Sequence, residues 1–532
     1  MSEQKPTIFL RQATGLVRSF GVVDAIWTNL SLVGIIFSLT YIASTAPLVG
    51  GDPLVGGLIA LVGMFFVALA FASVSILTPR TAGDYVFTSR YLHPALGFVG
   101  NAGYFVSTIP LFMGITITTI ESFGFSSLFA YLGLYFKNVG MTNLAVTLEM
   151  NWHYELALGG GLTVLVGLLP FFGYRIYKGL NNIILPVILI AVAVMFYVLA
   201  TTNPATSAAR LDSISGNSTL VSSVTAAGTP PPESGWLNAF ALNAVYVVGF
   251  SYIISAIYIA GEVKQVKRNM PIAILGTLLI TLAIFAGAVL LSYHAFGYNF
   301  LSNLYTLSIF DLKSPFAVTP YLNFLTASIS GNVYLGSFVI IVSIIQLLWY
   351  QTNAVFIGGR LLLSYSFDRI MPSFMGDVSE RFHVPLKAMV VSLIIGLLAG
   401  IVFVVPTTSS VAFLMSGAAV AILLLFPITV VGIALLVFKY GKKAEFNNSS
   451  LAKSILGGPL YVIAAVVTIV YSLATFVEYA TNPIIFVSSH IEALELIFVP
   501  VAILFVIYYV ARYINTRRGV KFDLIFKEIP PE

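Results

Sequence analysis

Long apolar stretches alternate along this chain with short polar segments, and the charged residues are concentrated in those segments. A hydrocarbon core of about 30 Å is crossed by roughly 20 helical residues. The pattern therefore predicts an all-α integral membrane protein with about 12 transmembrane helices. We place the spans at 23–49, 55–77, 95–131, 156–173, 181–200, 238–260, 270–296, 331–364, 384–405, 408–438, 457–480 and 485–513.

Composition agrees with lipid as the solvent of these helices. Hydrophobic residues make up 58% of the 532 positions and charged residues 9%, whereas a soluble domain carries about 25% charged residues. The net charge of +5 is explained by the anionic cytoplasmic leaflet, so no nucleic acid partner is expected. The chain has no cysteine, which excludes thiol catalysis, disulfides and cysteine-ligated metals.

Basic residues near span ends are retained on the cytoplasmic side of a membrane. With the N-terminus inside, only Lys137, Arg210 and Lys313 of the 26 basic residues fall in loops predicted outside. One missed or invented span would destroy this alternation. We therefore expect a multi-pass protein of the plasma membrane with both termini in the cytoplasm.

The largest predicted outside loop, 201–237, follows the fifth span and is rich in Ser, Thr, Gly and Pro. Such a composition buries little apolar surface, so we expect a mobile connector. Because five is an odd number, a second group of five helices would cross in the opposite sense, as in an inverted repeat. The expected divisions are 1–22 (cytoplasmic segment), 23–200 (first repeat), 201–237 (loop), 238–438 (second repeat), 439–456 (cytoplasmic loop), 457–513 (two peripheral helices) and 514–532 (cytoplasmic tail).

Gly34 and Gly249 lie near the middles of the first and sixth spans, beside small polar residues. Glycine weakens a helix by about 1 kcal/mol relative to alanine. A break within hydrocarbon is tolerated where it lines a cavity, and in transporters such breaks bind substrate. The alternative is that each glycine permits close packing between helices.

Four connecting segments carry a more specific pattern. They are 79–98 (PRTAGDYVFTSRYLHPALGF), 175–182 (RIYKGLNN), 248–274 (VGFSYIISAIYIAGEVKQVKRNMPIAI) and 359–385 (GRLLLSYSFDRIMPSFMGDVSERFHVP). Together they resemble the amino acid–polyamine–organocation (APC) superfamily of amino acid permeases, over roughly residues 15 to 440. The third segment departs from the family at Ser251, where the family has an acid.

The resemblance implies a LeuT-like fold, with a five-plus-five inverted repeat, discontinuous helices 1 and 6 and two peripheral helices. In such a site the substrate carboxylate meets freed backbone N–H groups, and its ammonium meets freed carbonyls and an aromatic face. Tyr246 and Phe250 are expected as gating or cation–π residues, with plain packing as the alternative. The expected substrate-binding residues are Ser31, Leu32, Val33, Gly34, Ile35, Tyr246, Val248, Gly249, Phe250 and Ser251.

Ion coupling has few candidates in the spans. Some proton-coupled relatives use a lysine of span five beside span one, but residues 183–190 contain none. Glu121 is a candidate proton acceptor, with a helix-capping role as the alternative. Thr352 and Asn353 are candidate sodium ligands that would face carbonyls of span one. No cofactor or structural metal is expected, and the driving ion is H+ or Na+.

These observations predict a secondary active transporter, such as a symporter, that moves a neutral or weakly polar amino acid by alternating access. Transport of amines or other small metabolites, amino acid exchange and a non-transporting nutrient sensor stay open as alternatives. An enzyme is not expected, because the five histidines lie near span ends or in loops and none pairs with another at helical spacing. The partners are the substrate and the lipid bilayer, and the oligomeric state is left open.

Overall fold

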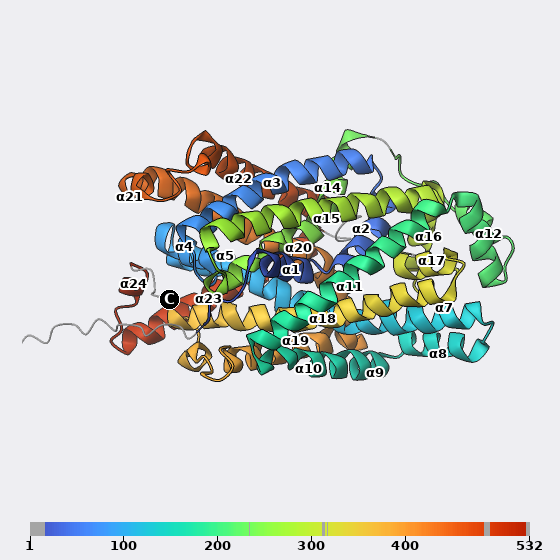
Figure 1. The fold of residues 1–532 in the computed structure, drawn as a ribbon, viewed down its shortest axis with the longest axis horizontal. Coiled ribbons are helices and arrows are strands. Elements are labelled where there is room, and N and C mark those ends of the chain that lie inside the picture. The colour runs from blue at the N-terminus through green and yellow to red at the C-terminus, as the bar shows by residue number, and fades with distance from the viewer. Residues whose placement is uncertain (1–15, 234, 311–313, 317, 483–489, 528–532) are drawn as a thin grey trace, which may run out of the picture.

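The apolar stretches form long helices that run side by side along the longest dimension of the molecule (Figure 1). The computed structural model describes residues 16–233, 235–310, 314–316, 318–482 and 490–527. In those ranges 11 helices are long and apolar enough to cross a membrane, and a bent pair makes up to 12. This confirms the predicted span count. Within the same ranges the structure contains no strand, only an isolated bridge between Phe20 and Val263.

The first five spans include a bent pair and two composite helices. They are span one, α1 (Val22–Val33) with α2 (Ile35–Val49); span two, α3 (Pro53–Leu77); span three, α5 (Pro94–Val106), η1 (Ser107–Met113), α6 (Gly114–Thr119), η2 (Ile120–Ser126) and α7 (Ser127–Tyr135); span four, α9 (Trp152–Glu155), η3 (Leu156–Gly160), α10 (Gly161–Gly167) and η4 (Leu169–Phe172); and span five, α11 (Tyr174–Thr201).

The remaining spans follow the long loop. They are span six, α14 (Trp236–Phe250) with η5 (Ser251–Glu262); span seven, α15 (Val266–Phe296); span eight, α18 (Val333–Phe367); span nine, α19 (Leu386–Val404); span ten, α20 (Pro406–Gly441); span eleven, α22 (Pro459–Thr481); and span twelve, α23 (His490–Arg517). The connecting helices are α4 (Gly83–Tyr91), α8 (Val139–Met150), α12 (Pro204–Ser215), α13 (Leu220–Thr225), α16 (Tyr298–Tyr305), η6 (Thr306–Phe310), α17 (Leu322–Ile329), η7 (Ser373–Gly376), α21 (Lys443–Asn448), η8 (Ile455–Gly457) and α24 (Phe522–Ile525).

Helix pairing relates the two groups of five spans. α1 packs against η5 and α2 packs against α14, so spans one and six lie antiparallel with their irregular points at one level. Spans two and seven are also in contact, through α3 and α15, and spans three and eight meet through η1, η2 and α18. Three spans of the first group thus pack against their counterparts in the second, as two repeats of opposite topology do across a shared interface.

Span three is longer than the sequence predicts, because it continues as one helix from Pro94 to Tyr135 over 42 residues. Two of its segments, η1 and η2, are π-helical. A π-helical turn widens a helix and is frequent at functional sites. Span three therefore brings residues of irregular backbone into the centre of the molecule.

The connector 201–237 differs from its prediction. Instead of a mobile loop it contains helices α12 and α13, in which Leu211, Leu220 and Val224 are buried. The guanidinium of Arg210 in α12 donates a hydrogen bond to the backbone carbonyl of Ile329 in α17. The prediction of an unpacked loop is wrong because each short helix buries an apolar face, through Leu211 in α12 and through Leu220 and Val224 in α13, and these faces have partners only in the folded protein.

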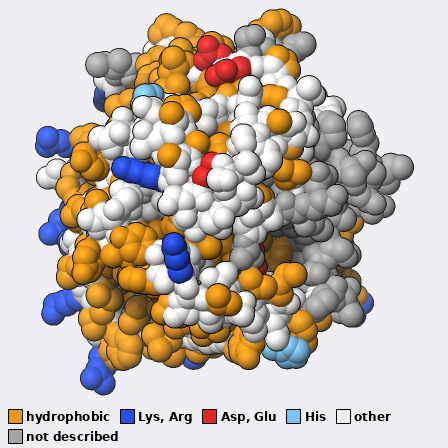
Figure 2. Space-filling model, turned by 90° about the vertical axis from the view of Figure 1, so that its right-hand side faces the viewer, with side chains coloured by type: hydrophobic (Ala, Val, Ile, Leu, Met, Phe, Trp, Pro, Cys, Tyr) orange, Lys and Arg blue, Asp and Glu red, His pale blue; other side chains and the backbone are white. Residues whose placement is uncertain are grey.

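The two ends of the helix bundle carry different connecting elements (Figure 1). α4, α21 and α24 lie at one end, which we call the terminal end, and α8, α12 and α16 lie at the other, which we call the loop end. Figure 2 views the molecule from the loop end, where few basic side chains face the viewer among many apolar and uncharged polar ones.

Candidate functional site

The centre of the site is the break in span one. Gly34 has a left-handed backbone conformation with φ of 61°, and α1 and α2 meet there at an angle of 44°. The last carbonyls of α1 and the first N–H groups of α2 therefore lack partners within their own helices. The carbonyl end carries partial negative charge and the N–H end partial positive charge. Both ends of a zwitterion can be bound at such a break.

Two side chains pair with the backbone groups around this break. The hydroxyl of Ser38 donates to the carbonyl of Val33 at 2.5 Å. The N–H of Phe37 donates to Oε1 of Gln346, from α18, at 3.1 Å. The other amide atom of Gln346, Nε2, is buried without a hydrogen-bond partner. It lies 3.3 Å from the position that a Cβ would occupy on Gly34.

Span six changes character at Ser251, where the α-helix α14 continues as the 3-10 helix η5. Asn29 of α1 bridges this region to span seven. Its Oδ1 accepts a hydrogen bond from the N–H of Ala256 at 2.6 Å, and its Nδ2 donates to Oγ1 of Thr277 at 3.1 Å. Asn29 therefore couples the backbone of η5 to α15.

Ser38 also relates the two predicted glycines to each other. A Cβ on Gly249 would lie 3.3 Å from Ser38 Cβ, and a Cβ on Gly34 would lie 4.0 Å from Ser38 Oγ. The same Cβ on Gly249 would lie only 2.5 Å from Cε2 of Phe285 in α15. Gly34 is thus the point of the break, whereas Gly249 lies inside α14 and provides close packing, with the change to η5 two residues later.

The other predicted substrate-binding residues are placed as follows. Leu32, Val33 and Ile35 are buried beside Gly34, and Val248 is buried in α14. The hydroxyl of Ser251 donates to the carbonyl of Val247 in its own helix at 2.8 Å. Their roles in binding stay predictions.

Three further predicted residues have partners in neighbouring helices. The hydroxyl of Ser31 donates to Oδ1 of Asn181 in α11 at 2.9 Å. That of Tyr246 donates to the carbonyl of Pro53 at the start of α3, 3.3 Å away. The ring of Phe250 lies 5.4 Å from that of Phe285, between centroids. Each of these three side chains thus has a structural contact with a neighbouring helix.

The aromatic residues beside the break are not the predicted Tyr246 and Phe250. Cε1 of Phe112, in η1, is 3.9 Å from the Cβ position on Gly34. Its ring centroid is 4.4 Å from that of Tyr350, 5.5 Å from that of Phe37 and 5.8 Å from that of Tyr252. Sequence reasoning missed Phe112, Tyr350 and Gln346. Gln346 is a polar residue in an apolar stretch, a signal that could have found it because such residues usually face the interior of a helix bundle. The two aromatic residues carry no comparable signal. The irregularity of span three is also not readable from its residues.

The ion candidates fall in two places. Glu121 is fully buried within η2, and neither carboxyl oxygen has a hydrogen-bond partner. It is therefore not the helix cap that was the alternative. Thr352 donates to the carbonyl of Val166 in α10 at 3.0 Å, and Asn353 accepts from the hydroxyl of Tyr177 in α11 at 2.5 Å. These two hydrogen bonds connect α18 to spans four and five, and the proposed role of the pair as sodium ligands beside span one stays a prediction.

Two ion pairs near the terminal end lie away from the break. Arg360 and Glu262 form a fully buried pair at 2.5 Å. Lys178, in the first turns of span five, pairs with Asp24 of α1 at 2.7 Å. The N–H groups of Ser19 and Phe20 both donate to the backbone carbonyl of Glu262, at 2.8 and 3.0 Å. The segment before span one is thus attached to the end of span six, which closes this end of the bundle.

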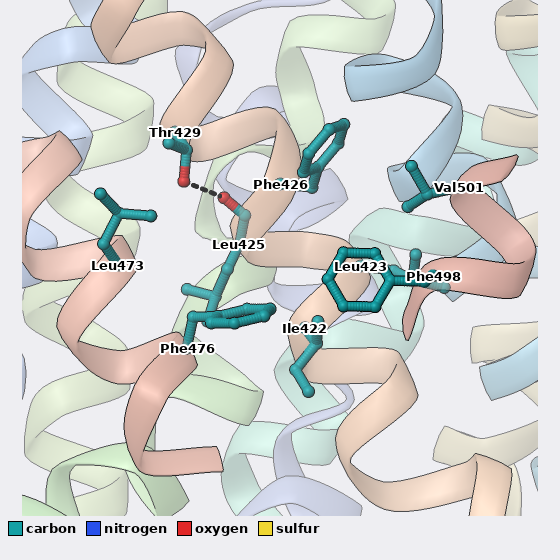
Figure 3. A pocket seen from close by; sticks show the side chains of 9 residues that line it. All are labelled: Ile422, Leu423, Leu425, Phe426, Thr429, Leu473, Phe476, Phe498 and Val501. Atoms are coloured by element: carbon teal, nitrogen blue, oxygen red, sulfur yellow. Dashed lines mark hydrogen bonds between the residues drawn. The ribbon is translucent and has the colours of Figure 1, made fainter. Parts of the chain in front are cut away.

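A separate apolar cavity of about 190 Å³ lies between α20, α22 and α23 (Figure 3). Eight of its nine lining side chains are apolar, and the hydroxyl of the ninth, Thr429, donates to the carbonyl of Leu425. Such a lining offers no free polar group to a carboxylate or an ammonium. In the ranges that the structure describes, no three His, Cys, Asp or Glu side chains gather so as to hold a metal ion.

Comparison with known proteins gives one family and one fold. The sequence profile of a family described as amino acid permease matches residues 24–525. A search of curated proteins finds no match. Among solved structures, the fold is similar to that of MhsT in complex with L-phenylalanine, with a TM-score of 0.51 and 15% sequence identity. The similarity covers 86% of this chain and 97% of that one.

Proposed function

Because this chain belongs to the amino acid permease family and is therefore a membrane transporter and not an enzyme, we propose that it is a secondary active transporter of neutral or weakly polar amino acids. The observation that carries this proposal is the buried, unpartnered Nε2 of Gln346 beside the break at Gly34. A carboxylate placed there would accept from this amide and from the first N–H groups of α2.

The chemistry around the break favours a substrate without a charged side chain. The side chains described beside Gly34 are Ser38, Gln346 and Phe112, and the ring of Tyr252 lies tilted against that of Phe112. None of them is ionised, so a basic or acidic substrate side chain would have no counter-charge. The carbonyl end of α1 and the aromatic faces of Phe112 and Tyr252 suit an ammonium group. L-Phenylalanine bound to MhsT is a neutral amino acid of this kind.

Transport would proceed by alternating access around this central site. In the described state the terminal end is held closed by the contacts of Phe20 with Glu262 and by the Arg360–Glu262 pair. Opening that end requires η5 to leave these partners while the pairing around Gly34 persists. The Ser38 hydroxyl and the Gln346 amide are suited to hold the break in shape during the motion, because both bond backbone groups there.

We further propose that the terminal end faces the cytoplasm of a cell with the protein in its plasma membrane. Helices α4 and α21 lie at this end (Figure 1), and their sequences contain basic residues such as Arg90 and Lys443, as expected for cytoplasmic segments. Glu121 is the proposed proton acceptor on the other side. Its carboxyl is buried without a hydrogen-bond partner. In such surroundings the free energy of burying a neutral carboxylic acid is far lower than that of burying a carboxylate.

Proteoliposomes with radiolabelled L-phenylalanine, L-leucine and L-serine test the proposal under a pH gradient, a sodium gradient and no gradient. We expect accumulation under one of the two ion gradients. Saturable binding without flux under any gradient would instead identify a sensor on the same scaffold, and counterflow without accumulation would identify an exchanger. Absence of both binding and movement of all three amino acids would contradict the amino acid assignment.

A further inference from the structure

Asp84 is a buried acid whose carboxyl bonds no basic side chain. It lies in the first turn of α4, and 1% of its surface is exposed. Its Oδ2 accepts hydrogen bonds from Nδ2 of Asn101 in α5 at 2.7 Å and from the hydroxyl of Tyr258 in η5 at 3.3 Å. Its Oδ1 has no hydrogen-bond partner. Three elements thus meet at one carboxyl group.

The titratable groups that face Asp84 are tyrosines from three elements packed near it. Tyr104 belongs to α5, Tyr258 to η5 and Tyr365 to α18. Tyrosine is uncharged at neutral pH. None of these groups therefore supplies the positive charge that would stabilise a buried carboxylate.

The charged groups nearby are engaged elsewhere. Arg90 of α4 forms a bidentate pair with Asp368 at 2.6 and 2.7 Å, and the hydroxyl of Tyr85 also donates to Asp368. α3 contains no charged residue. The single charged residue of α20, Lys439, lies over the rings of Phe446 and Tyr461. Burial consequently raises the pKa of Asp84 from its ordinary value of 3.8 to about 6, although the hydrogen bond from Asn101 opposes the increase.

The contact between α4 and η5 is one that opening of the terminal end must break. η5 ends at Glu262, whose backbone and side chain hold Phe20 and Arg360. Five residues before that end, Ile257 packs on α4, with Cγ1 3.8 Å from the Cβ position on Gly83. If η5 moves away from α4, Tyr258 is withdrawn from Asp84 and water reaches the carboxyl group.

We propose that Asp84 is a proton site coupled to opening of the terminal end, which at mildly acidic pH holds a proton while η5 packs on α4 and releases it when the two separate. In the opening step the O–H bond of the carboxylic acid breaks, the proton passes to water, and the carboxylate remains on Asp84. This inference rests on the proposed alternating-access transport, and it assigns to the terminal end a proton site separate from Glu121.

The direction of the pH dependence follows from linkage. The closed state binds the proton more tightly than the hydrated state, so low pH favours closure. Between pH 3.8 and about 6 the ratio of open to closed protein rises, at most about tenfold per pH unit for one proton. Above that range both states are ionised at Asp84, and the ratio no longer changes.

The lack of native cysteine permits a test that needs no substrate. A single cysteine from Ile257→Cys reports separation of η5 from α4, because the side chain at this position is fully buried in the closed state. Its rate of maleimide labelling is measured from pH 4.5 to 7.5 in proteoliposomes. It is divided by the rate of Asn447→Cys, an exposed position, which removes the intrinsic pH dependence of the thiol.

The normalised rate should rise with pH and level off near 6. Asp84→Asn in the same background should be labelled slowly and without pH dependence. Asp377→Asn, which changes an exposed acid paired with Lys387, should keep the rise. An unchanged rise in Asp84→Asn, or a flat profile in Ile257→Cys alone, would overturn the proposal.

Asn101→Ala provides a second variant that keeps the acid. It removes the closer donor to Asp84, so the rate should level off at a higher pH, and an unmoved profile contradicts the proposal. Failure of transport is distinguishable from failure of this inference. Labelling as predicted without amino acid flux would reject the transport function and retain the proton site. Amino acid flux with pH-independent labelling would retain the transport function and reject the proton site.

Discussion

Gln346 and Phe37 form a hydrogen bond across two spans that are remote in sequence, with 3.1 Å between Oε1 and the backbone nitrogen. The bond places the amide of span eight against the first turn of α2, where N–H groups have no partner within the helix. It also fixes the orientation of the amide, because only the oxygen can accept from Phe37. Nε2 is consequently directed to the side of Gly34.

Replacing Gln346 should weaken substrate binding. Gln346→Leu removes both the acceptor for Phe37 and the proposed donor to the substrate carboxylate. A hydrogen bond to a charged group contributes about 1.5–3 kcal/mol, so the dissociation constant should rise roughly 10- to 100-fold. Equilibrium binding of radiolabelled L-phenylalanine in detergent measures it.

Gln351 supplies the matched control for this variant. Its Nε2 donates to the carbonyl of Met113 and to Oγ1 of Thr163, away from the break. Gln351→Leu should lower thermal stability and leave the affinity of the folded protein within about threefold, well under 1 kcal/mol. Equal losses of affinity in the two variants would show that Gln346 acts through general packing.

Gly34→Ala should destabilise the protein and impair transport. An L residue with φ of 61° pays about 1–2 kcal/mol for the left-handed conformation, and the new Cβ would press on Nε2 of Gln346 at 3.3 Å. Thermal unfolding in detergent and uptake measure the two effects. Gly179→Ala is the control, since no atom lies within 4 Å of its Cβ position in α11. That change should be neutral or stabilising by up to about 1 kcal/mol.

Gly249→Leu should be destabilising because the new side chain would collide with the ring of Phe285, and removing that ring should restore part of the stability. Its Cβ would lie 2.5 Å from Phe285, and overpacking of this kind costs about 1–3 kcal/mol. The double variant Gly249→Leu/Phe285→Ala removes the ring and should recover part of the melting temperature. If uptake is unaffected by Gly249→Leu alone, close packing of spans one, six and seven at this level is not needed for transport.

Glu262→Gln should be strongly destabilising. Arg360 would then be a fully buried cation without its counter-charge, its guanidinium lying 3.4 Å from the centre of the Phe356 ring. Removing one partner of a buried pair costs about 3–5 kcal/mol, whereas replacing both with apolar residues is often neutral. Glu262→Leu/Arg360→Met should therefore be more stable than Glu262→Gln in thermal unfolding. The opposite order would show that Arg360 finds another partner.

The sequence by itself was sufficient to predict the number of spans and the break at Gly34. Each helix in lipid must satisfy its own backbone hydrogen bonds, so the length and composition of one stretch determine whether it crosses. A glycine flanked by small polar residues marks a weak point for the same local reason. The connecting segments between spans also sufficed to predict the family, which the profile match over 24–525 confirms.

Tertiary structure decided which side chains meet at the break. Phe112 could not be distinguished by sequence from the other aromatic residues of the spans. Gln346 stands out as a polar residue in an apolar stretch, but the sequence does not tell which span its amide meets. The orientation of α18 likewise brought the hydroxyl of Thr352 to the carbonyl of Val166 in α10. Contacts between spans depend on helix rotation and on the π-helical turns of span three, and neither is encoded locally. Local hydrophobicity therefore determined what crosses the membrane, while packing between distant helices decided what the site contains.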